Sequence, residues 1–147
     1  MKQGKSKIEI AAERYGIDPR RFGDTHVYKF AFDSIAAAEQ QVKNDRTYGP
    51  CLLLSIGGQS KDGLAASYAG LELQFEYGGK YFFSDGKTIE WIPFGILFGR
   101  VDPHSGFEWE IPPFFEKQID LTARVRNTTA GALIPTVVVK TVEIRGG

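Results

Sequence analysis

Two runs near the end of the chain constrain the fold more than any other feature. Between Ile119 and Arg126 apolar and polar residues alternate, which predicts a strand with one buried face. Residues 126–131 supply turn formers, and Thr136–Ile144 continues as a β-branched run that suits the middle of a packed sheet. Two such strands need a second sheet to cover them, so we predict an all-β sandwich.

The same alternation predicts further strands upstream. The clearest is Leu71–Tyr77, where apolar residues alternate with Glu and Gln. We expect Gly57–Gly58 to end the apolar run Cys51–Ile56, and an Asp-Gly turn at residues 85–86 to join two strands of a hairpin. The remaining predicted strands cover residues 26–33, 80–83, 88–92, 96–98 and 107–111.

Two segments between these strands are less regular. Residues 34–44 contain consecutive alanines that favour a helix, but Ile35 and Val42 suit a strand equally well. Because both flanking segments are β, an extended segment is the expectation. Residues 59–68 are polar and contain a Lys-Asp-Gly turn, so a loop is predicted there.

The first 25 residues are predicted to form an arm, and residues 26–147 the sandwich domain. Residues 1–7 read as a basic tail. A short helix over Ser6–Tyr15 is expected, because its apolar residues share one face and Gly16 is placed to end it. The arm is mildly basic, which fits either a solvated segment or one that reaches onto an acidic neighbour.

Length and charge limit the classes of partner. The 147 residues fit one domain, and 18 basic against 18 acidic side chains leave no net charge to attract nucleic acid. Nucleic acid is therefore not an expected partner. No apolar run approaches the roughly 20 residues of a membrane helix, so no membrane span is expected. The protein is expected to be soluble and made in a cytosol.

Few residues are arranged for chemistry. Cys51 is the single cysteine and lies in an apolar run, so a buried thiol is expected and an internal disulfide is excluded. His26 and His104 lack further ligands at metal-binding spacing. Asp102, His104 and Ser105 fit a turn better than a catalytic triad. We therefore predict no catalytic, cofactor or metal site, and no enzyme activity.

Three further patterns have simple structural interpretations. Glu108 and Glu110 project from one strand face, which is compatible with paired carboxylates acting on a sugar but more typical of a solvated face. The glycine pairs lack the spacing of phosphate-binding loops. Asn127-Thr128-Thr129 matches a glycosylation sequon, and a turn is the expectation there.

Aromatic residues crowd the stretch from Tyr77 to Phe115, more than one face of a small sheet usually buries. Most are expected in the core. The remainder would form an exposed patch, which marks either a subunit interface or a platform for stacking sugars. Trp91 and Trp109 are the candidates for the sugar platform.

A distinctive order of segments closes the chain. A proline-containing approach, Trp109–Phe115, precedes the alternating strand Ile119–Asn127, and a glycine turn then leads to the β-rich end at Ile144–Gly147. This order, over residues 70–147, resembles small jelly-roll structural proteins of bacteriophage virions. The resemblance implies a jelly-roll-like antiparallel sandwich, and the short N-terminal helix expected over Ser6–Tyr15 precedes it. Cupins share that topology, but this chain lacks their clustered metal-binding histidines.

The resemblance also implies a function. A virion protein of the decoration (cement), vertex or connector type is no enzyme; it assembles as a homo-oligomer, a trimer or pentamer, and docks to a major capsid or other virion protein. Its location would be the virion, after synthesis in the host cytoplasm. The expected interface residues are Arg20, Arg21, Phe22, Phe94, Phe114 and Phe115. A carbohydrate-binding sandwich, receptor-binding or lectin-like, is the alternative.

Overall fold

The computed structural model describes residues 6–82, 91–98 and 106–146, about half of them in strands. Its helical segments are α1 Lys7–Tyr15, the 3-10 turn η1 Pro19–Arg21, α2 Ala65–Gly70 and α3 Phe94–Phe98. Its strands are β1 Phe22–Ala31, β2 Gln40–Arg46, β3 Cys51–Ser60, β4 Leu71–Tyr77, β5 Lys80–Tyr81, β6 Ile92–Pro93, β7 Gly106–Glu108, β8 Phe114–Phe115, β9 Asp120–Asn127 and β10 Pro135–Ile144. No helix among the described residues is long and apolar enough to cross a membrane.

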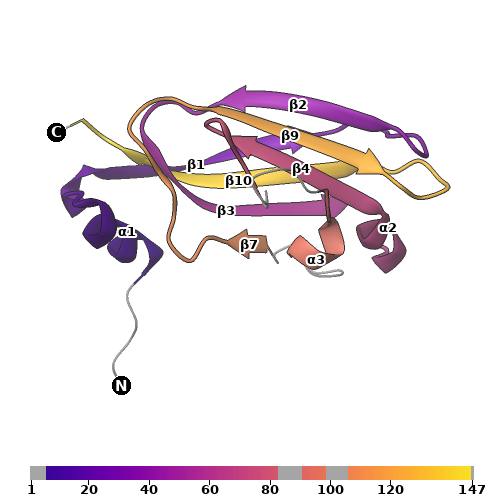
Figure 1. Ribbon diagram of the computed structural model, residues 1–147, viewed down its shortest axis with the longest axis horizontal. Coiled ribbons are helices and arrows are strands. Elements are labelled where there is room, and N and C mark those ends of the chain that lie inside the picture. The colour runs from indigo at the N-terminus through magenta and orange to yellow at the C-terminus, as the bar shows by residue number, and fades with distance from the viewer. Residues whose placement is uncertain (1–5, 83–90, 99–105, 147) are drawn as a thin grey trace, which may run out of the picture.

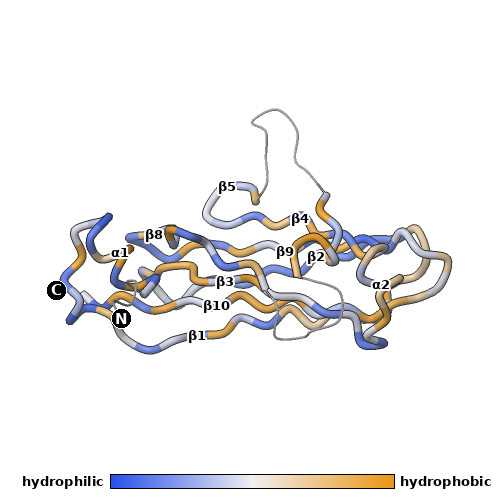
Figure 2. Tube along the Cα trace, turned by 90° about the horizontal axis from the view of Figure 1, so that it is seen from below, coloured by the Kyte–Doolittle hydropathy of each residue, from blue (hydrophilic) through white to orange (hydrophobic). Residues whose placement is uncertain are grey.

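The strands form two antiparallel sheets that face each other as two layers (Figure 1, Figure 2). The first sheet has the order β1-β10-β3-β7, with β8 also on β3; the second has β2-β9-β4-β5, with β6 also on β4. Thus β1 pairs with β10, β2 with β9, β3 with β7 and β4 with β5, as in one long hairpin wound into two layers. This is the strand order of a jelly roll, and the predicted jelly-roll-like sandwich is confirmed.

The core between the sheets is filled largely by aromatic rings. Burial alternates strictly along β4, as its sequence predicts. Phe75 stacks on Tyr77 with the ring centroids 5.6 Å apart, and Phe75 and Phe82 form a T-shaped pair with centroids 6.4 Å apart. Trp109 closes the cluster, 5.6 Å from Tyr77 and 5.3 Å from Phe82. Most aromatic side chains in the described residues therefore pack as the sequence predicts.

The helix α1 lies where the sequence predicts it. Ser6 Oγ accepts a hydrogen bond from the Glu9 backbone N–H at 3.2 Å and so caps the first turn. Gly16 ends the helix with φ 66°, a conformation that other residues adopt at a cost. The predicted boundary between residues 25 and 26 lies inside β1, which begins at Phe22 and pairs with β10.

Two predictions in the middle of the chain were wrong, and both errors have one cause. β3 continues through Gly57–Gly58 instead of ending there, and Ile96–Phe98 belongs to the helix α3 instead of a strand. A Cβ at Gly58 would come within 2.5 Å of the Phe98 ring, so the missing side chain makes room for α3 against β3. Phe94 and Phe98 lie one helical turn apart and contact each other at 5.2 Å.

The predicted loop at residues 59–68 was wrong in its second half, because α2 begins at Ala65. The carboxylate of Asp62 explains the helix. It accepts hydrogen bonds from Leu64 N–H at 3.1 Å and from Ser67 Oγ at 2.6 Å, which fixes the backbone that enters α2. These hydrogen bonds also lower the pKa of Asp62.

Residues 34–44 contain no helix, and the expected extended conformation is found at Ile35 and from Gln40 onward but not over the turn at residues 36–39. Ile35 forms a β-bridge with Leu133, and β2 begins at Gln40 after a turn in which Ala38 has φ 65°. The strand predicted over 107–111 is shorter, since β7 ends at Glu108. The predicted hairpin turn at 85–86, Phe83 and residues 88–90 lie outside the described residues, whereas Ile92 begins β6.

Candidate functional site

A β-bulge divides the outer face of the first sheet into two halves. Lys140 of β10 pairs with Ser55 of β3, but the next residue, Thr141, pairs with Leu53, so Leu54 is the extra residue. The bulge lets Leu54 and Ser55 share the outer face. Leu54 packs beside α1, whereas Ser55 lines an open hollow.

The helix α1 covers one half of this face, which we call the covered half. Leu52, Val142 and Ile144 alternate with residues of the main core, so their side chains project outward from the sheet. They pack with Ala11 of α1 and with Ile17 in a second hydrophobic cluster. Because Leu52 is fully buried, this cluster acts as a small core outside the sandwich.

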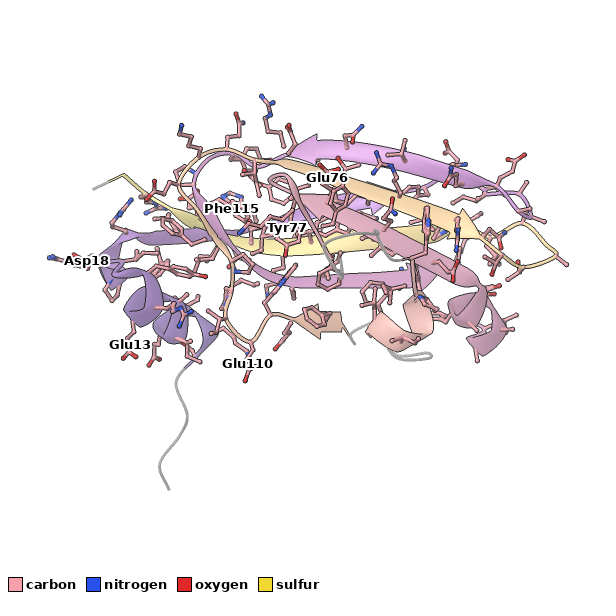
Figure 3. The ribbon with its side chains drawn as sticks, in the orientation of Figure 1. Glu13, Asp18, Glu76, Tyr77, Glu110 and Phe115 are labelled. Carbon is pink, nitrogen blue, oxygen red and sulfur yellow. The ribbon has the colours of Figure 1, made fainter. Side chains whose placement is uncertain are left out.

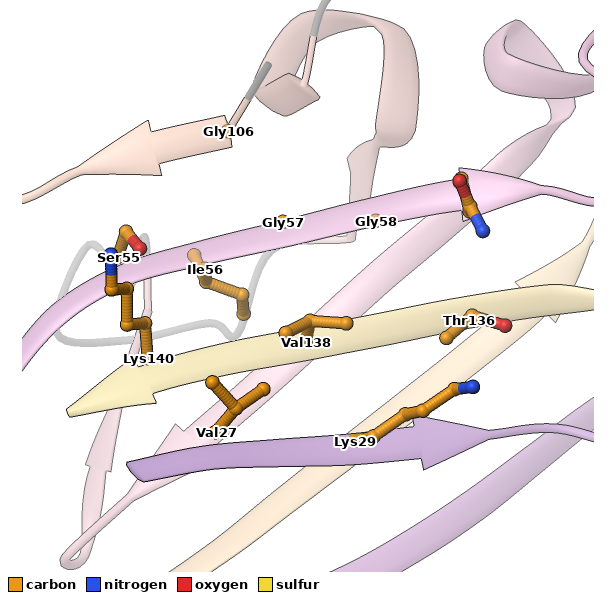
Figure 4. A pocket seen from close by; sticks show the side chains of 11 residues that line it. Val27, Lys29, Ser55, Ile56, Gly57, Gly58, Gly106, Thr136, Val138 and Lys140 are labelled. Atoms are coloured by element: carbon orange, nitrogen blue, oxygen red, sulfur yellow. The ribbon is translucent and has the colours of Figure 1, made fainter. Parts of the chain in front are cut away.

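The other half of the face is open and forms a hollow of about 500 Å³, which we call the trough (Figure 4). The strand register arranges its floor in rows across β1, β10 and β3. Two successive rows are Val27–Lys140–Ser55 and Lys29–Val138–Gly57. Gly57 pairs with Gly106 of β7, and neither has a side chain to fill the middle of the face.

A smaller hollow of about 190 Å³ continues the trough towards α1. Ser55 and Lys140 line both hollows, and Lys7 in the first turn of α1 lines the smaller one. Glu108 of β7, which pairs with Ser55, brings a carboxylate to this end. The trough therefore runs from an end without carboxylates to an end with one.

The charges on the two outer sheet faces are arranged differently. On the second sheet, Arg46 and Asp120 form an ion pair at 2.8 Å, and Arg126 forms one with Glu72. In the trough, Lys29 and Lys140 are exposed, and neither has an ion-pair partner among the residues that the structure describes. Their positive charges are therefore available to a ligand.

A polar cluster lies where β10 ends, on the face of the first sheet opposite to the covered half, because Glu143 alternates with the outward-facing Val142 and Ile144. Glu143 Oε2 is 2.9 Å from His26 Nε2, and its Oε1 accepts a hydrogen bond from Arg145 Nε at 2.7 Å. The hydrogen bond with His26 and then that with Arg145 lower the pKa of Glu143 to about 2. The cluster joins β1 to the end of β10.

Three of the predicted interface residues meet beside α1. Phe22 and Phe114 pack against the second hydrophobic cluster, and Arg21 donates a hydrogen bond from Nε to the Arg145 carbonyl at 2.8 Å. The ring of Phe114 lies 5.4 Å from that of Tyr15. The three residues thus take part in contacts within the chain, and their side chains are only partly exposed.

The other predicted interface residues differ in exposure. The Arg20 side chain is 90% exposed and pairs with Asp18 at 2.9 Å. Phe115 is half-buried and lies 6.1 Å from Tyr77, which Figure 3 shows beside it. Phe94 is 0% exposed. The prediction for Phe94 needs correction: its side chain fills the space between α3 and the sheets and cannot contact another subunit.

The two tryptophans do not form a shared platform. Trp109 is only 9% exposed and packs in the aromatic core, so it cannot stack on a sugar; this corrects the expectation for that residue. Trp91 is half-buried, and the Arg126 guanidinium lies 4.5 Å from the centre of its ring. The ring face towards Arg126 is therefore already occupied.

The residues considered for catalysis are not assembled into a site. Burial raises the pKa of the Cys51 thiol to about 11, which suppresses the reactive thiolate. Asp102, His104 and Ser105 lie outside the described residues. Glu108 and Glu110 are both exposed. Within residues 6–82, 91–98 and 106–146, no group of three or more His, Cys, Asp or Glu side chains could hold a metal ion.

The sequon at Asn127 is a structural turn, as expected. The Asn127 side chain is buried and donates hydrogen bonds from Nδ2 to the carbonyls of Ile35 at 2.9 Å and Gly131 at 2.7 Å. Its Oδ1 accepts from the backbone N–H of Thr129 at 2.8 Å. This amide therefore ties the end of β9 to the chain before β2.

The trough itself was missed by sequence reasoning. Lys29 and Lys140 are ordinary polar members of alternating strands and lie 111 positions apart by the difference of their numbers. Only the pairing of β1 with β10 brings them to one face. A Lys-Val alternation in both strands is the one signal that could have indicated it.

Comparison with protein-family models, with curated proteins and with solved structures finds no match to this chain.

Proposed function

We propose that this chain is a non-enzymatic structural subunit of a bacteriophage virion, of the decoration (cement), vertex or connector type. It assembles into a homo-oligomer, a trimer or pentamer, and docks to a major structural protein. The observation that supports this best is a jelly-roll sandwich whose interior is packed with aromatic rings. Because the interior is filled, any partner must bind to the outer surfaces. The fold alone does not identify that partner.

The end of the sandwich that carries α1 offers the surface for contacts between copies. Tyr15 is 37% exposed and Ile111 is 40% exposed, although both are large hydrophobic residues. The Tyr15 hydroxyl donates a hydrogen bond to the Pro112 carbonyl at 2.9 Å, and this contact places Ile111 beside α1. Arg20 adds an exposed guanidinium nearby. Exposed aromatic, aliphatic and Arg side chains are typical of interfaces between subunits.

Light scattering coupled to size-exclusion chromatography tests the assembly. The wild-type protein should have the mass of a trimer or pentamer, and Ile111→Glu should shift it towards the monomer. The matched control is Ile96→Glu, because Ile96 is 76% exposed on α3, which lies apart from α1 with β7 between them (Figure 1). A monomeric wild type, or equal loss of mass in both variants, would contradict the proposal.

A second experiment tests the virion. The chain should co-sediment with purified phage particles through a density gradient, in a fixed ratio to the major capsid protein. Ile96→Glu protein should remain with the particles. Absence of the wild-type chain from intact particles would contradict a virion role even if the oligomer forms.

The carbohydrate-binding alternative has weaker support. Of its two stacking residues, Trp109 is buried, and Trp91 already contacts Arg126. Binding to a glycan array that Trp91→Ala abolishes and Ile96→Glu preserves would favour the alternative over the structural role.

A further inference from the structure

We propose that the trough binds an extended peptide segment whose sheet-facing side chains, at every second position, are in turn acidic and aliphatic. The proposal deepens the virion role, since it gives the chemistry of the docking partner and rests on that role for the partner's identity. Three features of the trough carry it: its length along the strands, its unpaired lysines and its exposed aliphatic floor.

The length of the trough suits a short extended segment. Thr136, Val138 and Lys140 line it from successive outward positions of β10. Outward positions repeat about every 7 Å along a strand, so these three residues span about 13 Å. An extended peptide of four or five residues covers that distance. The bare backbone at Gly57 and Gly106 gives the peptide room to lie close to the sheet.

The charges favour acidic side chains on the ligand. Figure 4 shows Lys140 reaching from β10 towards Ser55, and Lys29 extending from β1 towards Thr136. The two ammonium groups are thus directed to opposite ends of the trough, where they can meet two separate carboxylates. Glu108 lines only the smaller hollow by α1. Its carboxylate would therefore repel an acidic side chain of the ligand at that end but not in the rest of the trough.

The floor between the lysines favours aliphatic side chains. Val27 is 60% exposed, and Val138 is half-buried beside Lys29. On the covered half of the same face, the chain's own helix buries Leu52 and Val142 in the corresponding way. A ligand that covers Val27 and Val138 would therefore bury apolar surface in the trough, as α1 buries it on the covered half.

A peptide fits the trough better than a glycan or a nucleic acid. None of the described residues that line the trough is aromatic, so it offers no ring on which a sugar or a base can stack. Two lysines are also few for a polyanionic backbone, which normally engages several cations. On the face that an extended ligand presents to the sheet, aliphatic and acidic side chains two positions apart match Val27 and Lys29 of β1 and Val138 and Lys140 of β10.

Fluorescence anisotropy with the labelled six-residue peptide Glu-Ser-Val-Ser-Glu-Ser tests the inference, because its glutamates and valine share one face when the peptide is extended. Wild-type protein should bind it with a Kd that rises with salt, and the double variant Lys29→Glu/Lys140→Glu should raise Kd at least about tenfold. The matched control is Lys61→Glu/Lys117→Glu, which changes two exposed lysines outside the trough and should leave Kd within about twofold. Circular dichroism checks that both double variants remain folded.

Several outcomes would overturn the inference. One is no binding by the wild type at millimolar peptide; another is equal weakening in both double variants, which indicates general charge attraction. Equal binding of a peptide with lysine in place of glutamate would also overturn it, as would binding of heparin in place of the peptide. If the oligomer forms but the peptide does not bind, only this inference fails. If the peptide binds to a monomeric protein, the proposed assembly fails instead.

Discussion

The covered half and the trough are two parts of one sheet face with opposite relations to solvent. Both are built from outward positions of β3 and β10, and the bulge at Leu54 separates them. In the covered half, Leu52 and Ile144 are buried by α1. In the trough, Val27 and Lys140 remain exposed.

The difference shows how the same strands can serve stability and binding. Where the outward residues are uniformly large and apolar, the chain covers them itself, and the burial contributes to folding. Where valine alternates with lysine, intramolecular cover would bury charges, which is costly without partners. Substitutions in the covered half should therefore affect stability, and those in the trough should affect binding.

The largest effect is expected from Leu52→Ala in the covered half. Leu52 is 0% exposed beneath α1, so its truncation should lower the free energy of unfolding by about 2–5 kcal/mol in urea denaturation. The counterpart in the trough is Val27→Ala, which should cost about 0.5 kcal/mol or less. Similar losses in the two variants would remove the distinction between the halves.

A smaller loss is expected from Ser6→Ala, which removes the cap of α1. The Glu9 N–H would lose its acceptor, and the free energy of unfolding should fall by about 1 kcal/mol. Hydrogen exchange should rise in α1 first, with little change in β4 of the second sheet. Equally faster hydrogen exchange throughout both sheets would show that loss of the α1 cap destabilises the whole protein and not α1 alone.

The Glu143 cluster, on the opposite face of the sheet from the covered half, predicts that stability depends on pH where β1 meets the end of β10. The pKa of Glu143 is lowered from 4.5 to about 2, so its contribution is present above the ordinary pKa and is lost as the pH falls from about 4.5 towards 2. Thermal melts of wild type and Glu143→Gln should differ near about pH 6 and converge near about pH 2.

Glu116→Gln serves as the control for that measurement, because Glu116 is an exposed carboxylate outside the cluster. Its melting temperature should differ little from that of wild type throughout the same pH range. A constant gap between wild type and Glu143→Gln from neutral to acidic pH would contradict the assigned role.

The smallest expected signal comes from Cys51, on the core side of β3 next to Leu52. Burial raises its thiol pKa to about 11, so folded protein should react with iodoacetamide very slowly at about pH 8. Protein unfolded in urea should react at the ordinary rate, which mass spectrometry measures. Rapid labelling of the folded protein would show that the core side of β3 is accessible to solvent at Cys51.

Sequence reasoning succeeded where one face of a long element is buried. The alternation in Leu71–Tyr77 and Ile119–Asn127 survives in β4 and β9 because each has one face in the core. α1 was predictable because Ser6 and Gly16 are local end signals. The predicted strands are enough to indicate the all-β class and the sandwich.

The errors arose where distant residues decide local structure. Ile96–Phe98 is too short for periodicity to separate helix from strand, and its conformation depends on the space above Gly58. The expected exposure of Phe94 and Trp109 failed for a related reason, since aromatic content does not say which rings face the core. The trough required the register of β1, β3 and β10, which no local pattern contains.

The positions of β9 and β10 have a consequence for biosynthesis. Each occupies the inside of a sheet, with β9 between β2 and β4 and β10 between β1 and β3. A ribosome makes both after all their neighbours, so a nascent chain that has reached residue 119 holds the flanking strands of both layers but neither strand that joins them. Folding must wait for residues 120–144, and until then the unjoined strands depend on chaperones or dilution to avoid aggregation.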